Sequence, residues 1–375
     1  MKHCLILMLL LACAPAFAHK PSDSYLSLNS ASSSPQITGR WDIALRDLQL
    51  VIDLDSNNDG NITWGELRNR QPELAQQILP MLTVQTGQGE TAQPCPLTLT
   101  GLQANDHVDG TYAALHFQGT CPAAPSQLGV HYRFLFDRDP SHHGLLKSNH
   151  DGVELAVTFS DNQRRHQLDT SGAGQWQAFQ GFVHQGIHHI LIGYDHILFL
   201  LTLLFPAVLV WQRGGWQPAP TMRGALTQTL AIVTAFTVTH SLTLALASLG
   251  LVNLPSWLLE SAIAITVGLG ALSNLAPRYF PRRWVMALVF GLIHGLGFAA
   301  VLADLGLDGG SLVLTLLGFN LGVEAGQALI VVVFVPAAFL VRRTAAYRRW
   351  FVPIGSVAII AIATVWAVDR LSGAL

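Results

Sequence analysis

Long apolar stretches dominate the second half of the chain. Six of them lie between residues 184 and 370, near 187–210, 226–249, 257–275, 284–303, 312–340 and 351–368. Each one exceeds or approaches the roughly 20 consecutive apolar residues that a helix needs to cross a bilayer. The pattern therefore predicts a membrane domain over residues 184–370, built as an all-α bundle of six helices.

The first half shows a shorter, alternating pattern of apolar and polar residues. A strand-like run lies at Tyr25–Leu28, and later runs cover 97–102, 111–118, 128–137 and 153–159. Turns rich in Asp, Gly, Pro and Ser separate the later runs, and alternation of this length is typical of half-buried strands. These runs predict a small β-sandwich.

Helical spacing precedes most of these strands. Residues 40–53 place apolar side chains at helical positions, namely Trp41, Ile43, Ala44, Leu48 and Val51. A polar loop follows at 55–66, and helical segments continue to about Leu82. Residues 169–180 are small and polar and are predicted to be a linker. Together with the strands, the pattern predicts an α+β soluble domain over residues 19–180.

The N-terminus resembles a targeting segment. Lys2 gives a basic start, residues 4–14 form an apolar run too short to span a bilayer, and Ala16-Phe17-Ala18 offers small residues at a cleavage site. The sequence predicts a signal peptide over residues 1–18 and a mature chain that begins at His19. The alternative is lipid attachment at Cys13. Both interpretations export the domain that follows.

The few charged residues indicate an orientation. The last 195 residues hold ten Arg and six Asp or Glu, and Arg side chains gather after the first, third and fifth apolar stretches, at Arg213, Arg223, Arg278, Arg282, Arg283, Arg342, Arg343, Arg348 and Arg349. Positive loops stay in the cytoplasm. We therefore expect a bacterial inner-membrane protein whose exported domain and C-terminus lie on the periplasmic side. The soluble half carries no basic patch, which excludes nucleic-acid binding.

Two cysteines remain after the predicted leader. Cys95 and Cys121 form an even pair in an exported domain. Disulfides persist in such oxidising compartments. We expect one disulfide between them, with two free buried thiols as the alternative.

Residues 55–66 match the twelve-residue calcium loop of an EF-hand. The loop offers oxygen ligands at the expected offsets, from Asp55, Asn57, Asp59, the Asn61 carbonyl, Thr63 and Glu66. Gly60 allows the sharp turn at position 6 and Ile62 is the apolar anchor at position 8. The sequence predicts a calcium site between two helices, structural rather than signalling because only one such loop is visible. The alternative is a polar turn without an ion.

Ionisable side chains also occur in or beside the apolar stretches. They are His184, His188, His189, Asp195, His196, His240, Glu260, His294 and Glu324. Such groups are costly at bilayer depth and usually mark a site or pathway. On one continuous helix, His184, His188 and Asp195 would lie within about 40° of one another. Imidazoles with a carboxylate suit nickel, cobalt, zinc, copper or iron(II).

The predicted transition-metal ligands are therefore His188, His189, Asp195, His196, His240, His294 and Glu324. Asp195 has a second possible role, as the group that orients a ligating histidine. Gly291 and Gly295 beside His294 permit close helix packing. The alternative is that these histidines are hydrogen-bonded packing residues and that Glu260 is interfacial.

One motif resembles a known family. His189-x-x-x-Gly193-x-Asp195-His196 is similar to the HPxxGxDH motif of the HupE/UreJ family, with Ile190 where the family usually has Pro. The stretch around His294 and the helix that carries Glu324 resemble its later motifs. The resemblance covers residues 184–370 and implies a polytopic protein associated with nickel supply to hydrogenase and urease. The long exported domain resembles the extended form of that family.

Three functions are compatible with these patterns. The leading hypothesis is a membrane permease or accessory protein for a divalent transition metal, nickel or cobalt before zinc or copper. The inner half of the predicted bundle has few ionisable or amide groups apart from Gln327, so a dead-end metal cavity stays open. The first alternative is an intramembrane zinc-dependent hydrolase. The second is a non-catalytic, calcium-stabilised interaction module on a membrane anchor.

Overall fold

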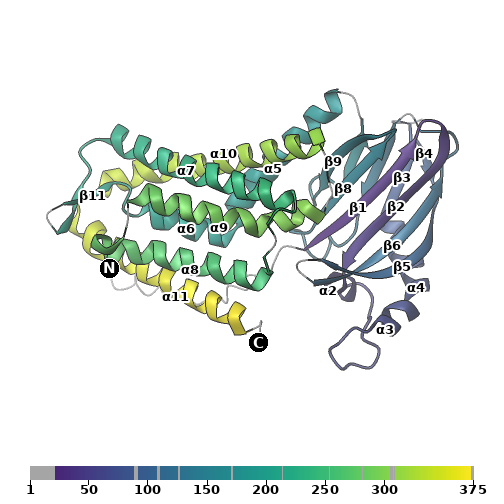
Figure 1. The fold of residues 1–375 in the computed structure, drawn as a ribbon, viewed down its shortest axis with the longest axis horizontal. Coiled ribbons are helices and arrows are strands. Elements are labelled where there is room, and N and C mark those ends of the chain that lie inside the picture. Colours follow the sequence, from purple (N-terminus) through teal and green to yellow (C-terminus); the bar gives the residue numbers. More distant parts are fainter. Residues whose placement is uncertain are drawn as a thin grey trace. The chain divides into compact units, whose positions relative to one another are not determined.

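The computed structural model describes residues 22–372 except 88–91, 108–109, 126, 170–171, 213, 253, 281, 305–306 and 308. The predicted signal peptide, the cleavage site before His19 and the alternative site at Cys13 lie outside the described residues. The chain divides into two compact units (Figure 1). We call them the sheet unit, residues 21–184 with 300–319, and the helical unit, residues 185–299 with 320–375.

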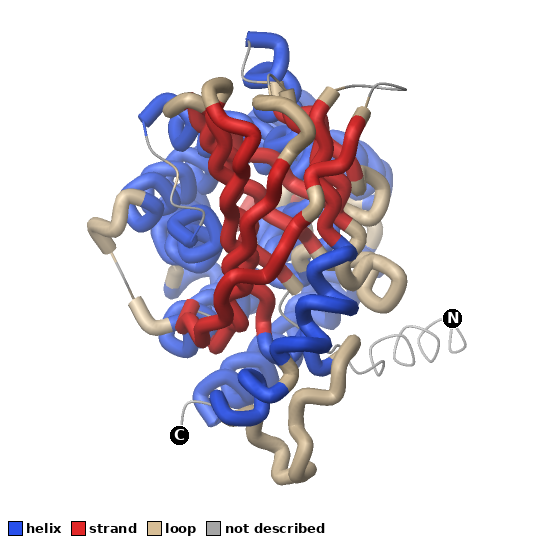
Figure 2. The backbone as a smooth tube through the Cα atoms, turned by 90° about the vertical axis from the view of Figure 1, so that its right-hand side faces the viewer, coloured by secondary structure: helices blue, strands red, loops and turns tan. Residues whose placement is uncertain are grey.

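Two β-sheets form the sheet unit (Figure 2). One sheet has six strands in the order β5-β6-β2-β1-β8-β9, and the other has four in the order β10-β7-β3-β4. The strands are β1 Asp23–Ala31, β2 Ser34–Ala44, β3 Leu82–Thr86, β4 Gln93–Cys95, β5 Leu97–His107, β6 Gly110–Thr120, β7 Leu128–Tyr132, β8 His143–His150, β9 Val153–Phe159 and β10 Arg165–Leu168. Each alternating run in the sequence contributes a strand.

The two sheets share one hydrophobic core. Trp41 of the six-stranded sheet packs edge-on against Tyr132 of the four-stranded sheet, with ring centroids 5.4 Å apart, and against Phe134 at 5.5 Å. All three side chains are fully buried. Residues of both sheets belong to the same apolar cluster. This arrangement confirms the α+β class predicted for the first half of the chain.

A chain of hydrogen bonds crosses this core. From donor to acceptor it runs through Trp41, Ser24, Tyr132, His142, Ser22 and Asp47, with contacts of 2.6 to 3.3 Å. Because Ser22 gives its one hydroxyl hydrogen to Asp47, it accepts from Nδ1 of His142, and Nε2 of His142 accepts from Tyr132. Burial lowers the pKa of His142 to about 3. The ring is therefore neutral at physiological pH.

The helix predicted over residues 40–53 is wrong for its first part. Residues 40–44 end strand β2, and only α2, Leu45–Gln49, is helical before a turn. Trp41 and Ile43 are two positions apart, which is the period of a strand, whereas Trp41, Ala44, Leu48 and Val51 have helical spacing. Trp41 pairs with Leu26 of β1 and Leu115 of β6, so both neighbours hold it in the sheet. Tertiary pairing overrides the local preference here.

The later helical prediction is closer to the structure. The short helices α3, Trp64–Asn69, and α4, Gln71–Glu73, follow the polar loop. A π-helical turn and a 3₁₀ turn then lead to Met81.

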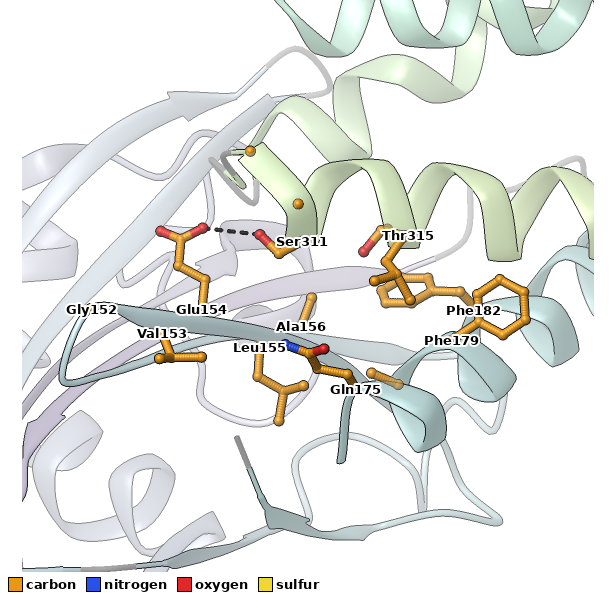
Figure 3. A pocket seen from close by; sticks show the side chains of 14 residues that line it. Gly152, Val153, Glu154, Leu155, Ala156, Gln175, Phe179, Phe182, Ser311 and Thr315 are labelled. Carbon is orange, nitrogen blue, oxygen red and sulfur yellow. Dashed lines mark hydrogen bonds between the residues drawn. The ribbon is translucent and has the colours of Figure 1, made fainter. Parts of the chain in front are cut away.

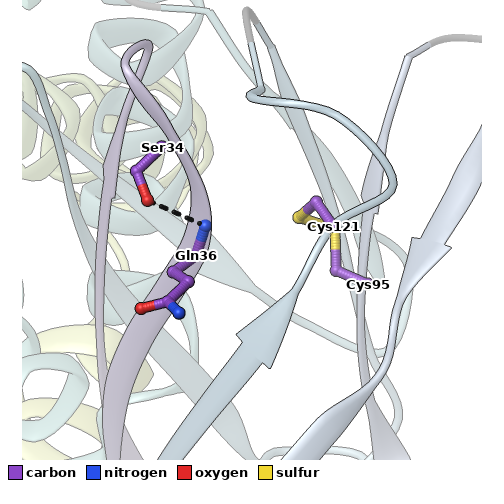
Figure 4. The surroundings of a disulfide bond; sticks show 4 residues. All are labelled: Ser34, Gln36, Cys95 and Cys121. Carbon is purple, nitrogen blue, oxygen red and sulfur yellow. Dashed lines mark hydrogen bonds between the residues drawn. A yellow bond between two sulfur atoms is a disulfide. The ribbon is translucent and has the colours of Figure 1, made fainter.

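The predicted disulfide is confirmed: Cys95 at the end of β4 is joined to Cys121, directly after β6 (Figure 4). It ties one strand of each sheet together.

The helical unit contains long apolar helices. Three of its helices, α5, α9 and α10, extend into the sheet unit. The helices are α5 Gly172–Ile192, α6 Tyr194–Leu204, α7 Met222–Ser248, α8 Ser256–Leu275, α9 Arg283–Asp304, α10 Gly309–Val341 and α11 Val352–Ser372. Among the described residues, four helical segments are long and apolar enough to cross a membrane, α7, α8, α10 and one that ends in α11. A bent pair, α5 and α6, makes a fifth candidate, and the apolar part of α9 is shorter.

The first predicted membrane helix, 187–210, is broken. The chain bends by 70° between α5 and α6, and Gly193 at the bend is extended, with φ −69° and ψ 103°. A Cβ atom at Gly193 would lie 2.7 Å from the carbonyl oxygen of His189 and 2.9 Å from Nδ1 of His196, which only glycine avoids. The residues predicted to be a linker, 169–180, form the first turns of α5 from Gly172 onward.

Three connections of the helical unit meet at one end. The segment between α6 and α7 contains a hairpin, β11 Leu209–Gln212 and β12 Gly215–Pro218. Arg283 donates to the carbonyl of Pro206 at 3.0 Å, and Arg342 donates to that of Ala219 at 3.0 Å. Arg348 donates to the carbonyl of Trp216 at 3.4 Å. The connections that follow α6, α8 and α10, which carry the arginines, are thereby held together.

Candidate metal centre

The bend at Gly193 brings two histidines together. His189 lies in the last turn of α5 and His196 in the first turn of α6. Their ring centroids are 4.5 Å apart, with the ring planes at 65°. On a single straight helix the two residues would be neighbours two turns apart, so the bend, rather than the helical period, places the rings in contact.

Asp195 holds the second of these rings. Its Oδ1 lies 3.0 Å from Nδ1 of His196, whose side chain is only 8% exposed. Asp195 is also within electrostatic range of His189 and His294. A carboxylate on one ring nitrogen fixes the orientation of an imidazole and raises its strength as a ligand through the other nitrogen.

Helix α9 contributes His294 because glycines let it approach α7. A Cβ atom at Gly291 would lie 2.4 Å from the carbonyl oxygen of Phe236, and one at Gly295 would lie 2.3 Å from that of His240. The two backbones therefore pack directly on each other, as the Gly-His-Gly pattern predicts. The ring of His294 then lies 5.6 Å from that of His196.

Two further side chains hold the remaining histidines. Thr266 of α8 places Oγ1 3.3 Å from Nε2 of His294. Asn320 of α10 places Oδ1 3.3 Å from Nδ1 of His240. Both histidines are buried, and His240 stacks on Phe236 with centroids 5.7 Å apart.

The imidazoles of His196, His240 and His294 share one feature. In each, one nitrogen is hydrogen-bonded to Asp195, Asn320 or Thr266, as described above. The other nitrogen, Nε2 of His196, Nε2 of His240 and Nδ1 of His294, is buried and has no hydrogen-bond partner among the described residues. Buried polar atoms are nearly always satisfied in folded proteins, so three such atoms need an explanation. The rings of His196 and His294 are in contact, and His240 and His294 both pack against Phe236.

Other predicted ligands lie elsewhere. The carboxylate of Glu324 accepts a hydrogen bond of 2.8 Å from Thr234. Glu260, which is not one of the predicted ligands, forms an ion pair of 3.3 Å with Arg370. His188 is next to His189 on α5, and neighbouring residues of a helix point about 100° apart. Within the described part of the chain, no three His, Cys, Asp or Glu side chains already converge as a metal cage.

Sequence reasoning missed Thr266 and Asn274. Both are polar residues within the third apolar stretch, and their polarity at those positions is the sequence signal that could have identified them. Asn274 is buried and donates to the carbonyl of Thr202 at 2.9 Å and to Ser356 at 3.3 Å, which links α8 to α6 and α11.

The loop at 55–66 is held by hydrogen bonds between its side chains and its own backbone. Gly60 has φ +83°, the left-handed conformation expected at position 6. Its N–H donates to Oδ2 of Asp55 at 2.8 Å, and the N–H of Asp59 donates to Asn57 at 2.8 Å. The N–H of Asn61 donates to Asp59, also at 2.8 Å. The acidic side chains thus curl inward around the loop.

Glu66 links the loop to helix α3. Its carboxylate accepts from Ser56 and from Thr63, whose hydroxyl lies 2.7 Å away, and Thr63 caps the helix. Hydrogen bonds from Thr63, then from Ser56, lower the pKa of Glu66 to about 2. On the incoming side α2 ends at Gln49, whose side chain caps the N–H of Leu54. A complete EF-hand has a helix directly before its loop, and in this chain a turn takes the place of that helix.

Comparison with known proteins identifies one match. The model of a family described as HupE / UreJ protein matches residues 163–370, more than half of the 375 residues. That range contains the bent helix pair, the histidines described above and most of the helical unit. No curated protein matches the chain.

Proposed function

The chain belongs to the HupE/UreJ family, and on that premise we propose that it is a membrane permease or accessory protein for a divalent transition metal. Nickel and cobalt are the favoured cargo, ahead of zinc and copper. Imidazole is a suitable ligand for all four, whereas calcium and magnesium prefer oxygen.

The observation that carries this proposal is the set of three half-satisfied imidazoles. His196, His240 and His294 each have one anchored nitrogen and one buried nitrogen without a partner. Leaving a buried polar atom unsatisfied costs about 1–3 kcal/mol. A metal ion that accepts all three nitrogens would remove that cost, and the anchored nitrogens match the outer hydrogen bonds found around ligating histidines.

The loose arrangement of the site favours a cargo ion over a resident cofactor. The ring of His196 lies 4.5 Å from that of His189 and 5.6 Å from that of His294. No three ligand side chains of the described residues converge on one point, so binding an ion requires the rings to move. The rings of Phe199 and Phe236 lie 5.4 and 5.5 Å from that of His294 and provide an apolar wall. A transported ion has to bind well enough to enter and weakly enough to leave.

The orientation follows from the positive loops. We propose six spans in the inner membrane, with the bent pair as the first and α9 as the fourth. The three arginine-bearing connections then face the cytoplasm, and the exported domain and the C-terminus face the periplasm. His240 lies in the last third of α7 and His294 in the second half of α9, so the histidines open toward the periplasmic half of the membrane.

Buried polar groups continue from the histidines toward the arginine-bearing end. One turn before His240, the hydroxyl of Thr237 donates to Gln327 at 3.0 Å. Asn274 lies further along, where its carbonyl accepts from Trp216 at 3.1 Å. This series of polar contacts favours passage of an ion over a closed cavity, because amide and hydroxyl oxygens are successive ligands of moderate strength.

Nickel uptake into proteoliposomes tests this function. The full chain should bind and take up nickel or cobalt, and His196→Ala and His294→Ala should reduce both. His116→Ala, a substitution in the exported sheet, serves as the matched control. Binding without uptake would instead support the accessory role or the zinc hydrolase alternative. Unchanged binding in both membrane variants would contradict the site.

We also propose that the exported domain binds calcium through residues 55–66. The ligands are side-chain oxygens of Asp55, Asn57, Asp59 and Glu66, the carbonyl of Asn61, and Thr63 directly or through a water. The inward turn of the loop and the ionised state of Glu66 support this. Extracellular loops of this kind bind weakly, at about 10⁻⁴–10⁻³ M, which suits a stabilising role.

A further inference from the structure

A pocket of about 520 Å³ lies in the sheet unit between strand β9 and the first turns of α5 and α10 (Figure 3). Its size is within the range of about 300–1,000 Å³ that is usual for small-molecule sites. All of its lining residues belong to the same compact unit. The pocket is separate from the histidines and from the calcium loop.

The pocket has a largely apolar end and a polar end. Phe179 and Phe182 of α5 lie at the first, with Thr315 of α10 beside them, and Leu314 of α10 also lines the pocket (Figure 3). Glu154 of β9 and Ser311 of α10 form a polar end, where the hydroxyl donates to the carboxylate at 3.2 Å (Figure 3). An occupant therefore needs a long apolar part and a polar head.

The carboxylate at the polar end is paired with a cation that does not itself line the pocket. Nζ of Lys147, on the neighbouring strand β8, lies 2.7 Å from Oε1 of Glu154. Each carboxylate oxygen has lone pairs for more than one donor. A zwitterionic head group matches such a pair, because its cation can contact Glu154 while its anion contacts Lys147.

The surrounding side chains indicate the level of lipid head groups. Trp176, 58% exposed, stacks on Phe179 with ring centroids 5.3 Å apart. Tryptophan is enriched where membrane proteins leave the hydrocarbon layer. On α10, the exposed side chains of Val313 and Leu317 follow directly along the chain, where the candidate span begins.

We propose that this pocket binds one phospholipid of the outer leaflet, with a primary ammonium in its head group and one acyl chain against Phe179, Phe182 and Leu314. The ammonium N–H groups donate to Glu154, and the phosphate contacts Lys147. A quaternary ammonium lacks those N–H donors, so a choline head group binds more weakly. The proposal needs membrane insertion of α10 but not the metal function.

The test is native mass spectrometry of the full chain released from nanodiscs of ethanolamine, choline or glycerol phospholipid. We expect one retained ethanolamine lipid per chain and ~10-fold less retained choline lipid, the loss typical of a missing hydrogen bond to a charged group. Glu154→Gln should lower retention of the ethanolamine lipid by a similar factor. Glu73→Gln, which removes a carboxylate paired with Arg70 elsewhere in the sheet unit, is the matched control.

A second variant keeps the test independent of the charged pair. Leu314→Trp fills the pocket, and it should abolish retention of every lipid while the melting temperature shows that the chain is folded. Equal retention of the three lipids, or retention unchanged by both Glu154→Gln and Leu314→Trp, would overturn the proposal. Retention of the glycerol lipid alone would also overturn it, because that head group has no cation for Glu154.

Discussion

Calcium should raise the thermal stability of the protein, and Glu66→Gln should remove the effect. The substitution keeps the shape of the side chain and takes away the bidentate charge at position 12 of the loop. It also weakens the contacts that Glu66 accepts from Ser56 and Thr63, whose hydrogen bonds hold its pKa near 2.

The size of the effect follows from the site. Glu66 must exchange its contacts with Ser56 and Thr63 for the ion, so we expect a dissociation constant in the weak range of about 10⁻⁴–10⁻³ M. At about 10 mM calcium the ion then stabilises the folded state by roughly 1.4–2.7 kcal/mol. For a unit of this size that shifts the melting temperature by about 3–10 °C.

The assay compares melting of the full-length protein in detergent with calcium, with magnesium and with a chelator. Hydrogen exchange at residues 55–66 locates the change, because protection should rise there first. Glu73→Gln is the matched control, since its carboxylate pairs with Arg70 outside the loop. A calcium shift that survives Glu66→Gln, or no shift in the wild type at 10 mM (about ten or more times the expected constant), would refute the reasoning.

Three further outcomes are expected. Replacing Cys95 and Cys121 by alanine removes a cross-link over a sequence separation of 26, which costs about 3 kcal/mol and lowers the melting temperature by roughly 6–12 °C in a thermal scan. Because the pKa of buried His142 is lowered to about 3, the unfolded state binds more protons between pH 6.5 and 3, so the free energy of unfolding decreases by up to about 1.4 kcal/mol for each unit by which the pH is lowered. Urea titrations should show a shallower fall for His142→Gln, and parallel curves would contradict this. Thr266→Val should weaken nickel binding ~10-fold in calorimetry. Thr364→Val should not, because the hydroxyl of Thr364 donates to the carbonyl of Ile360 in its own helix; equal affinities of the two variants would contradict the orienting role.

The sequence predicted the class of each half because burial there follows a simple period. Burial alternates along β5 and along the second half of β6. Most of the apolar stretches form helices that are long and apolar enough to cross a membrane. Prediction failed where two periods overlap: Trp41 and Ile43 have the two-residue period of a strand, while Trp41 and Ala44 have the spacing of a helix. The decision there came from β1 and β6, which lie far away in the sequence.

The candidate site was predictable in its residue types but not in its geometry. The helical period places His189 and His196 on one face, yet the bend at Gly193 moves both, and a single glycine inside an apolar stretch does not reveal a 70° break. Thr266 could not be assigned to His294, because that pairing depends on how α8 and α9 pack. Glu324 shares the chemistry of the ligands, but its carboxylate accepts a hydrogen bond from Thr234.

The most direct test of the proposed function is X-ray absorption at the nickel edge of the metal-loaded, full-length protein. The account predicts scattering from coordinated imidazoles of His196, His240 and His294, with one imidazole fewer in His294→Ala. A spectrum with oxygen ligands only, or one that His294→Ala leaves unchanged, would contradict the claim that these three histidines hold the ion.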